Sequence, residues 1–316
     1  MSKSITSYLK KYSYLFGIFL FFIILTKTDF NTILEGIKNV KVSYLIMAGL
    51  LNLPVLFIKS CCWNYIKKQQ GISYKLKDSF MMYCSGIFIG ALTPGRIGDL
   101  TKALYLKKDG HPLGKSILTT VLERLSDFFF LGIFIFFGSL LFFNPIYKKI
   151  WMPLIIILLL IILFGIFLKT GLLKILLEKI FYILVPLKYQ SSWKISFQNF
   201  IQDLKIYKLK NYLIIFLITV SAWTFYYLQA YVLAGGAGIH VPVVYLAVIV
   251  TIAGLITLIP VSVLGIGTRD AALIFLFAPL SVNKEQAILL SVLILSMSLI
   301  TCIIGFTCWL FKPIRF

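Results

Sequence analysis

Charged residues are scarce in this chain of 316 residues. They make up 13% of the sequence, whereas an ordinary soluble domain carries about 25%. Acidic residues are the rarer sign, with 11 Asp and Glu against 31 Lys and Arg. A mean hydropathy of +0.95 over the whole length leaves no room for a sizeable water-soluble domain. The scarcity of charge therefore predicts a polytopic membrane protein.

Histidine and cysteine are also few, and they are poorly spaced for chemistry. The sequence has 2 His and 5 Cys, and it contains no C-x-x-C pair, so we expect no metal, no cofactor and no disulfide framework. The H-E-x-x-H, G-x-S-x-G and G-x-x-x-x-G-K-[ST] templates are missing as well. An enzyme is not excluded by these absences, but nothing in the sequence supports one.

The excess of basic residues would indicate nucleic acid binding in a soluble protein. Here Lys and Arg fall mainly between long apolar runs, which is the pattern that the positive-inside rule produces. We therefore expect no nucleic acid partner. The distribution of Lys and Arg predicts a multi-pass protein of the inner (cell) membrane with both termini in the cytoplasm.

Six apolar runs are long enough, or nearly so, to cross the hydrocarbon core, which takes about 20 helical residues. They are 12–26, 42–58, 116–143, 150–168, 211–234 and 286–311. Two further apolar regions, 79–106 and 243–280, are interrupted by proline, glycine and charge. Because unwound backbone at membrane depth is stable only inside protein or beside a wet cavity, we predict two re-entrant helical hairpins. The alternative is that each piece is a short full span.

The two interrupted regions also align with each other. The offset between Asp99 and Asp270 recurs between two Ile-Leu pairs, which start at residues 117 and 288. We predict an all-α fold of about six spans plus two hairpins in an inverted repeat, which is typical of transporters with a site near the bilayer midplane. The halves would be residues 1–168 and 211–316, joined by a basic linker at 169–210.

The linker carries an apolar stripe at helical spacing. The stripe consists of Trp193, Phe197, Phe200, Ile201, Leu204 and Tyr207. We interpret it as one face of an amphipathic helix that lies on the cytoplasmic leaflet. A linker packed against the helical bundle is the alternative.

Ionisable residues in the apolar regions are the functional candidates, because a charge at the centre of a membrane helix costs roughly 2.5–3.5 kcal/mol. The cations, which we expect to bind an anionic head group, are Arg96, Lys102, Arg124 and Arg269. The anions, which would orient the cations or carry a proton, are Asp99, Glu123, Asp127 and Asp270. On a helix, Arg124 would reach Asp127 at i+3. The alternative is a buried ion network that only fixes packing.

Proline and glycine residues mark the expected breaks in the two hairpins. These breaks are assigned to Pro94, Gly98, Pro260, Gly265 and Gly267. Helix N-termini exposed at such breaks would add positive potential for an anion.

The charged segments resemble the signatures of a known family. Residues 94–99 and 121–127 are similar to a P-x-R-x-G-E … E-R-x-x-D signature, and residues 259–270 are similar to P-x-x-x-G-x-G-x-R-E. Both signatures belong to the lysylphosphatidylglycerol synthase transmembrane region, or flippase-like, family, and the resemblance spans nearly the whole chain. Asp99 and Asp270 stand where the family has Glu, and Lys102 stands where Arg is common, which puts head-group geometry and selectivity in doubt.

The resemblance implies translocation of an anionic phospholipid or a polyprenyl-linked lipid between leaflets. The family's aminoacyl-transfer activity lies in a separate soluble domain, which we do not expect here because the sequence stops at Phe316. The expected partners are an anionic membrane lipid and, as a candidate, a lipid-modifying enzyme. The alternatives are an integral membrane transferase acting on a lipid phosphate and a non-catalytic scaffold for a lipid-modifying partner.

Overall fold

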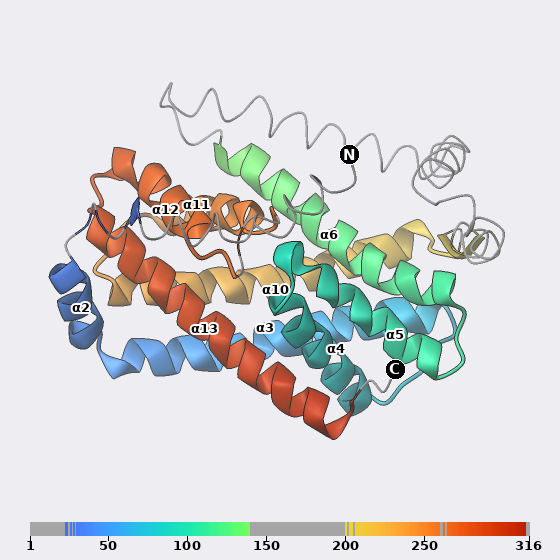
Figure 1. The fold of residues 1–316 in the computed structure, drawn as a ribbon. Coiled ribbons are helices and arrows are strands. Elements are labelled where there is room, and N and C mark those ends of the chain that lie inside the picture. The colour runs from blue at the N-terminus through green and yellow to red at the C-terminus, as the bar shows by residue number, and fades with distance from the viewer. Residues whose placement is uncertain are drawn as a thin grey trace, which may run out of the picture. The chain divides into compact units, whose positions relative to one another are not determined.

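The computed structural model describes residues 23–24, 26, 28, 30–139, 200, 202–204, 206–259, 262 and 264–313. Within these ranges every regular element is a helix, which confirms the predicted all-α class (Figure 1). The α-helices are α2 (Phe30–Asn39), α3 (Val42–Gln69), α4 (Leu76–Ala91), α5 (Thr101–Lys108), α6 (Leu113–Ser139), α10 (Leu209–Gly236), α11 (Val243–Ile256), α12 (Thr268–Phe277) and α13 (Lys284–Phe311). The 3-10 helices are η1 (Pro94–Leu100) and η2 (Ala278–Leu280).

Among the described helices, three are long and apolar enough to cross a membrane: α3, α10 and α13, each of 28 residues. At about 1.5 Å per residue such a helix is about 42 Å long, which exceeds the thickness of the hydrocarbon core. Helix α11 is equally apolar but has only 14 residues. The predicted run 150–168 and most of 12–26 lie outside the described residues, so the number of six spans stays a prediction.

Helix α3 is longer than the hydropathy pattern predicts. The pattern ends the span at Ile58 and places Lys59 and Lys67 in a cytoplasmic segment, whereas α3 continues to Gln69. Both lysines are buried within the helix. The helix continues past the apolar run because the fold surrounds these ammonium groups with polar and aromatic partners, and the cytoplasmic position of the two lysines stays a prediction.

The chain divides into two compact units. The first unit comprises Met1–Ile58, Phe80–Thr101 and Ser221–Phe316, and the second comprises Lys59–Ser79 and Lys102–Val220. In the first unit, α13 contacts α2 and α12, and α12 contacts α11. Its helices are also joined by polar bonds within apolar surroundings, since the Asn52 side chain donates to the hydroxyl of Thr301 at 2.9 Å.

The second unit has its own apolar core. It is formed by Cys62, Ile66, Leu118, Leu122, Tyr207 and Ile215. Phe200 and Leu204 pack against this core, and the Tyr207 hydroxyl donates to the backbone oxygen of Ile66 at 2.9 Å. These three residues belong to the predicted linker stripe, so its described part packs on helices of its own unit. The stripe residues Trp193, Phe197 and Ile201 lie outside the described residues.

Both interrupted regions contain the breaks that the sequence predicts. The first consists of α4, η1 and α5, and the second of α11, a turn segment and α12. Whether the regions are re-entrant hairpins and form an inverted repeat stays a prediction. The broken segments matter for function because they carry Arg96, Asp99, Arg269 and Asp270.

Candidate functional site

The break after α4 places Arg96 in an unusual backbone conformation. Pro94 begins η1, where its missing N–H removes a donor, and Gly95 and Arg96 follow with φ of 63° and 56°. A positive φ is uncommon for a non-glycine residue and costs free energy. The Thr93 hydroxyl fixes the break from both sides, because it donates to the Gly90 oxygen at 2.9 Å and accepts from the Gly98 N–H at 2.7 Å.

The side chain of Arg96 is exposed. Its guanidinium group makes no hydrogen bond or ion pair with any other residue that the structure describes. Its charge acts at longer range on Arg269, Tyr226 and Cys302, all in the first unit. Arg96 is therefore a cation whose donors are available to a ligand.

Asp99 lies close to the same break but is buried. Its carboxylate packs against Gly90 of α4, where the space that a Cβ would occupy is already filled by Asp99. The Cβ position of Gly98 is likewise filled by the backbone of Ile89. The predicted break residue Gly98 is thus a point where η1 approaches α4 closely.

The second break begins α12 with a polar cap. Gly267 has a φ of 81°, which favours glycine, and its N–H donates to Oδ2 of Asp270 at 2.7 Å. A carboxylate in this position also faces the positive end of the helix dipole. Gly265 is buried in the turn before α12, whereas Pro260 lies outside the described residues.

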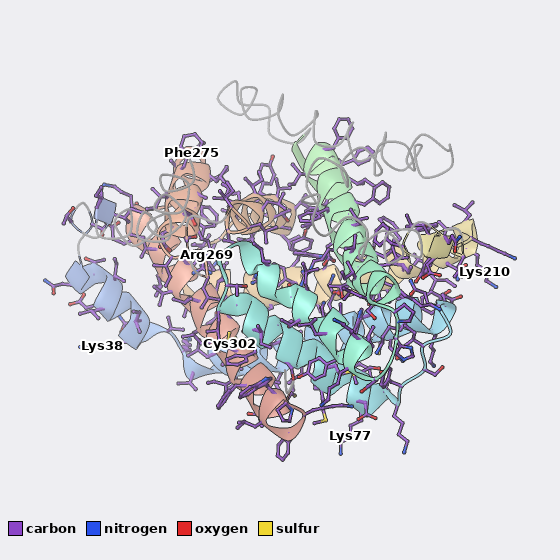
Figure 2. All side chains as sticks on the ribbon, turned by 45° about the vertical axis from the view of Figure 1, so that its right-hand side comes forward. Lys38, Lys77, Lys210, Arg269, Phe275 and Cys302 are labelled. Atoms are coloured by element: carbon purple, nitrogen blue, oxygen red, sulfur yellow. The ribbon has the colours of Figure 1, made fainter. Side chains whose placement is uncertain are left out.

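Arg269 is held by α13, in contrast to Arg96. Its Nε donates to the Ser291 hydroxyl at 2.7 Å, its Nη2 donates to the Ser291 backbone oxygen at 3.0 Å, and its Nη1 donates to the Leu264 oxygen at 3.4 Å. The Ser291 hydroxyl in turn donates to Asp270. Phe275, which lies on α12 with Arg269, is exposed, whereas Arg269 is only 6% exposed (Figure 2).

Arg269 is joined to α13 inside the helix and away from its ends. Ser291, which holds Arg269, and Cys302, which lies within range of the Arg96 charge, are each roughly two turns or more from the nearer end of that helix. Arg96 and Arg269 thus both belong to the compact unit that contains α13. We call Arg96, Arg269, Asp270 and Ser291 the arginine site.

The second unit contains a separate buried ion network. Nζ of Lys102 lies 2.5 Å from Oε2 of Glu123, and both side chains are essentially inaccessible. Lys59 pairs with Asp127. The sequence prediction that Arg124 reaches Asp127 one turn on is confirmed, with Nη1 and Oδ2 3.7 Å apart.

The four predicted head-group cations therefore divide between the units. Arg96 and Arg269 belong to the first, whereas Lys102 and Arg124 belong to the second and face carboxylates there. Among the described residues, no group of three or more His, Cys, Asp or Glu is arranged to hold a metal ion.

Sequence reasoning missed two polar residues that complete these sites. Lys59 directly follows the predicted span 42–58, and its distance from Asp127 in sequence gives no signal of their ion pair. Ser291 lies in an apolar run, where a single serine is unremarkable, and only the fold brings it to Arg269 and Asp270.

The chain is similar to known membrane proteins. The family model of the lysylphosphatidylglycerol synthase transmembrane region matches residues 12–305 of this chain. A curated relative, the UPF0104 membrane protein MJ1595 of Methanocaldococcus jannaschii, is 33% identical over 123 residues. That alignment covers 38% of this chain and 36% of the relative, so it spans little more than a third of the relative's length. Because the family model matches most of the chain, the protein belongs to the lysylphosphatidylglycerol synthase transmembrane region family.

Proposed function

We propose that this protein moves an anionic lipid between the leaflets of the inner membrane. The observation that carries the proposal is the exposed guanidinium of Arg96, which lies in the break between α4 and α5 and has no partner among the described residues; the proposal places this break within the membrane. A cation at this depth is costly unless an anion or water accompanies it. The phosphate of a lipid head group is an anion that the membrane itself supplies.

The two arginines of the arginine site would then have different tasks. Arg96 would bind the phosphate directly, because a guanidinium can donate two parallel hydrogen bonds to phosphate oxygens. Arg269, whose donors are occupied by Ser291 and Leu264, would contribute positive potential from a fixed position. The acyl or prenyl tail would stay in the surrounding lipid.

The finer architecture belongs to the same proposal. Two re-entrant hairpins at 79–106 and 243–280, related as an inverted repeat, would present their breaks to the head group near the midplane. The Lys102 and Arg124 network of the second unit would pair with carboxylates while no lipid is bound, and it would open to a head group during transport. Movement would be downhill or coupled to an ion gradient through Asp99, Glu123, Asp127 or Asp270.

A lipid substrate also agrees with the family, whose description names lysylphosphatidylglycerol, a phospholipid. The membrane would supply the substrate, and a lipid-modifying enzyme is a candidate partner.

Flipping of fluorescent lipids in proteoliposomes tests the proposal. Wild-type protein should move an anionic phospholipid faster than phosphatidylcholine, and Arg96→Ala should slow that movement by roughly 10- to 100-fold, the equivalent of one charged hydrogen bond. Arg96→Lys should keep part of the rate, because it retains the charge but loses the bidentate geometry.

Lys38→Ala is the matched control, because it removes an exposed charge at the end of α2 (Figure 2). Equal movement of all lipids by the wild type and by Arg96→Ala would refute the role of the arginine site. Absence of flipping by folded protein, with turnover of a lipid phosphate and a soluble co-substrate, would replace the translocator by a membrane transferase.

A further inference from the structure

Cys84 of α4 and Cys308 of α13 are two free thiols of the first unit that lie at a close contact between their helices. The contact centres on Gly305 of α13. A Cβ at this glycine would lie 2.5 Å from the backbone oxygen of Cys84 and 3.3 Å from its carbonyl carbon. The backbone of α4 therefore occupies the space that a side chain at residue 305 would need.

Cys308 lies beside this contact on α13. It follows the contact glycine by three residues, and residues three apart are neighbours on a helix surface. The ring of Phe88, one turn after Cys84, packs against Phe306 and Trp309 with centroids 5.3 Å and 6.5 Å apart. These ring contacts hold the two helix faces together on both sides of Cys308, and the thiols of Cys84 and Cys308 share a hydrogen bond.

The two thiols differ in their accessibility. Cys84 is 1% exposed, whereas Cys308 is half-buried and lies within one turn of the end of α13. A reagent in water therefore reaches Cys308 first. A disulfide requires Cα atoms about 4.4–6.8 Å apart, and two helices come that close only where a small residue lets their backbones approach. Gly305 supplies such a residue next to this pair.

We propose that Cys84 and Cys308 are a redox modification site, where a reversible disulfide locks α4 to α13 and slows transport. The oxidant is a low-molecular-weight disulfide. The Cys308 thiolate attacks one of its sulfurs and releases the first small thiol, and the Cys84 thiolate then attacks the Cys308 sulfur and releases the second. The protein gives up two protons and two electrons, and the small disulfide takes them up as it becomes two thiols.

The bond would act on both charged breaks. Helix α4 leads into η1, which carries Arg96, and α13 holds Arg269 through Ser291. A covalent bond between α4 and α13 restricts the movement of one break relative to the other. The effect on transport rests on the proposed function, whereas the formation of the disulfide does not.

Oxidised glutathione is the probe for disulfide formation in the purified full-length protein. Peptide mapping without reductant should find the peptides of Cys84 and Cys308 joined in the wild type. The same bond should form in Cys302→Ser, which is the matched control because it removes another half-buried thiol of α13 (Figure 2).

The two single variants test the order of the steps. In Cys84→Ser a glutathione adduct should stay on Cys308, because the second thiol is missing. In Cys308→Ser the buried Cys84 should stay unmodified. Thermal unfolding in detergent checks that each variant is folded. A glutathione adduct that persists on Cys308 in the wild type, a bond to a different cysteine, or the absence of any reaction would overturn the modification site.

Flipping of fluorescent phosphatidylglycerol in proteoliposomes measures the effect of the lock. Oxidised wild-type protein should flip this lipid at least about 10-fold more slowly than reduced protein, because movement of structural elements limits many such cycles. Dithiothreitol should restore the rate, and Cys308→Ser should not respond to the oxidant.

The outcomes separate this inference from the proposed function. A disulfide that forms but leaves the flipping rate unchanged overturns the lock and leaves the translocator standing. If folded protein forms the disulfide but flips no lipid in either redox state, the proposed function fails, and the lock on transport fails with it.

Discussion

Arg96 and Arg269 carry the same guanidinium group in opposite situations. Arg269 donates to a serine and to two backbone oxygens and is nearly inaccessible, whereas Arg96 is exposed on a strained turn. A buried guanidinium is stable only when its donors are satisfied, so Ser291 is the residue on which Arg269 depends. Ser291 also donates to Asp270, and it therefore links two buried charges of α12 to α13.

Replacement of Ser291 tests whether the stability of the fold depends on its bonds to Arg269 and Asp270. Ser291→Ala removes one bond from Arg269 and one from Asp270, so we expect the free energy of unfolding to fall by about 1–3 kcal/mol. Unfolding followed by circular dichroism in detergent micelles gives the change. Ser298→Ala is the control, because Ser298 only donates to the backbone oxygen of Ile294 one turn earlier and should change stability little. Equal losses in the two variants would contradict the linking role.

At the scale of elements, the helix breaks were predictable and the helix ends were not. Pro94 and the glycines near residues 95–98 and 265–267 mark the breaks because proline lacks a donor and glycine alone adopts a positive φ at low cost. The continuation of α3 past Ile58 was unpredictable, because the ion pair of Lys59 with Asp127 forms only in the fold. Likewise, Arg96 was predictable as a candidate site residue from its sequence context, but Ser291 became a candidate only when the fold placed it beside Arg269.

The close packing of α13 against α4 in the first unit can be tested by a substitution at Gly305. A Cβ at Gly305 of α13 would lie 2.5 Å from the backbone oxygen of Cys84 in α4 and 2.8 Å from Cβ of Phe88. Gly305→Ala should therefore lower stability by about 1–3 kcal/mol, because the backbone of α4 must shift. Gly49→Ala is the matched control, since a Cβ there meets nothing within 4 Å, and alanine favours the helix.

Thermal unfolding of both glycine variants in the same detergent measures the difference. A Gly305→Ala variant as stable as Gly49→Ala would show that α4 and α13 do not approach as closely as described.

The orientation of the whole molecule in the membrane stays a prediction from the distribution of Lys and Arg along the sequence. Lys284 and Lys312 stand at opposite ends of α13, which is long enough to span. Helix α2, which ends near Lys38, packs on α13 where Gly36 meets Leu289, close to the end that carries Lys284. The cytoplasmic termini predicted from the whole sequence would put the Lys312 end in the cytoplasm and the end with Lys38 and Lys284 outside.

Labelling of single cysteines in intact cells tests this orientation. In a cysteine-free background, Lys38→Cys and Lys284→Cys should react with a membrane-impermeant maleimide, and Lys312→Cys should react only after the cells are permeabilised. The cysteine-free parent should stay unlabelled under both conditions. Reaction of Lys312→Cys in intact cells would reverse the predicted orientation.

The depth of the arginine site has an electrical consequence. Ser291 of the arginine site lies two turns inside α13, so a singly charged head group held there has crossed part of the membrane potential, and each half of that potential amounts to roughly 1 kcal/mol for each 100 mV. For the proposed substrate, a potential that is negative inside therefore draws the anion from the cytoplasmic leaflet toward Arg96 and onward to the outer leaflet. A complete crossing at 100 mV favours the outer leaflet by roughly 50-fold, so the resting membrane would drive export without any nucleotide.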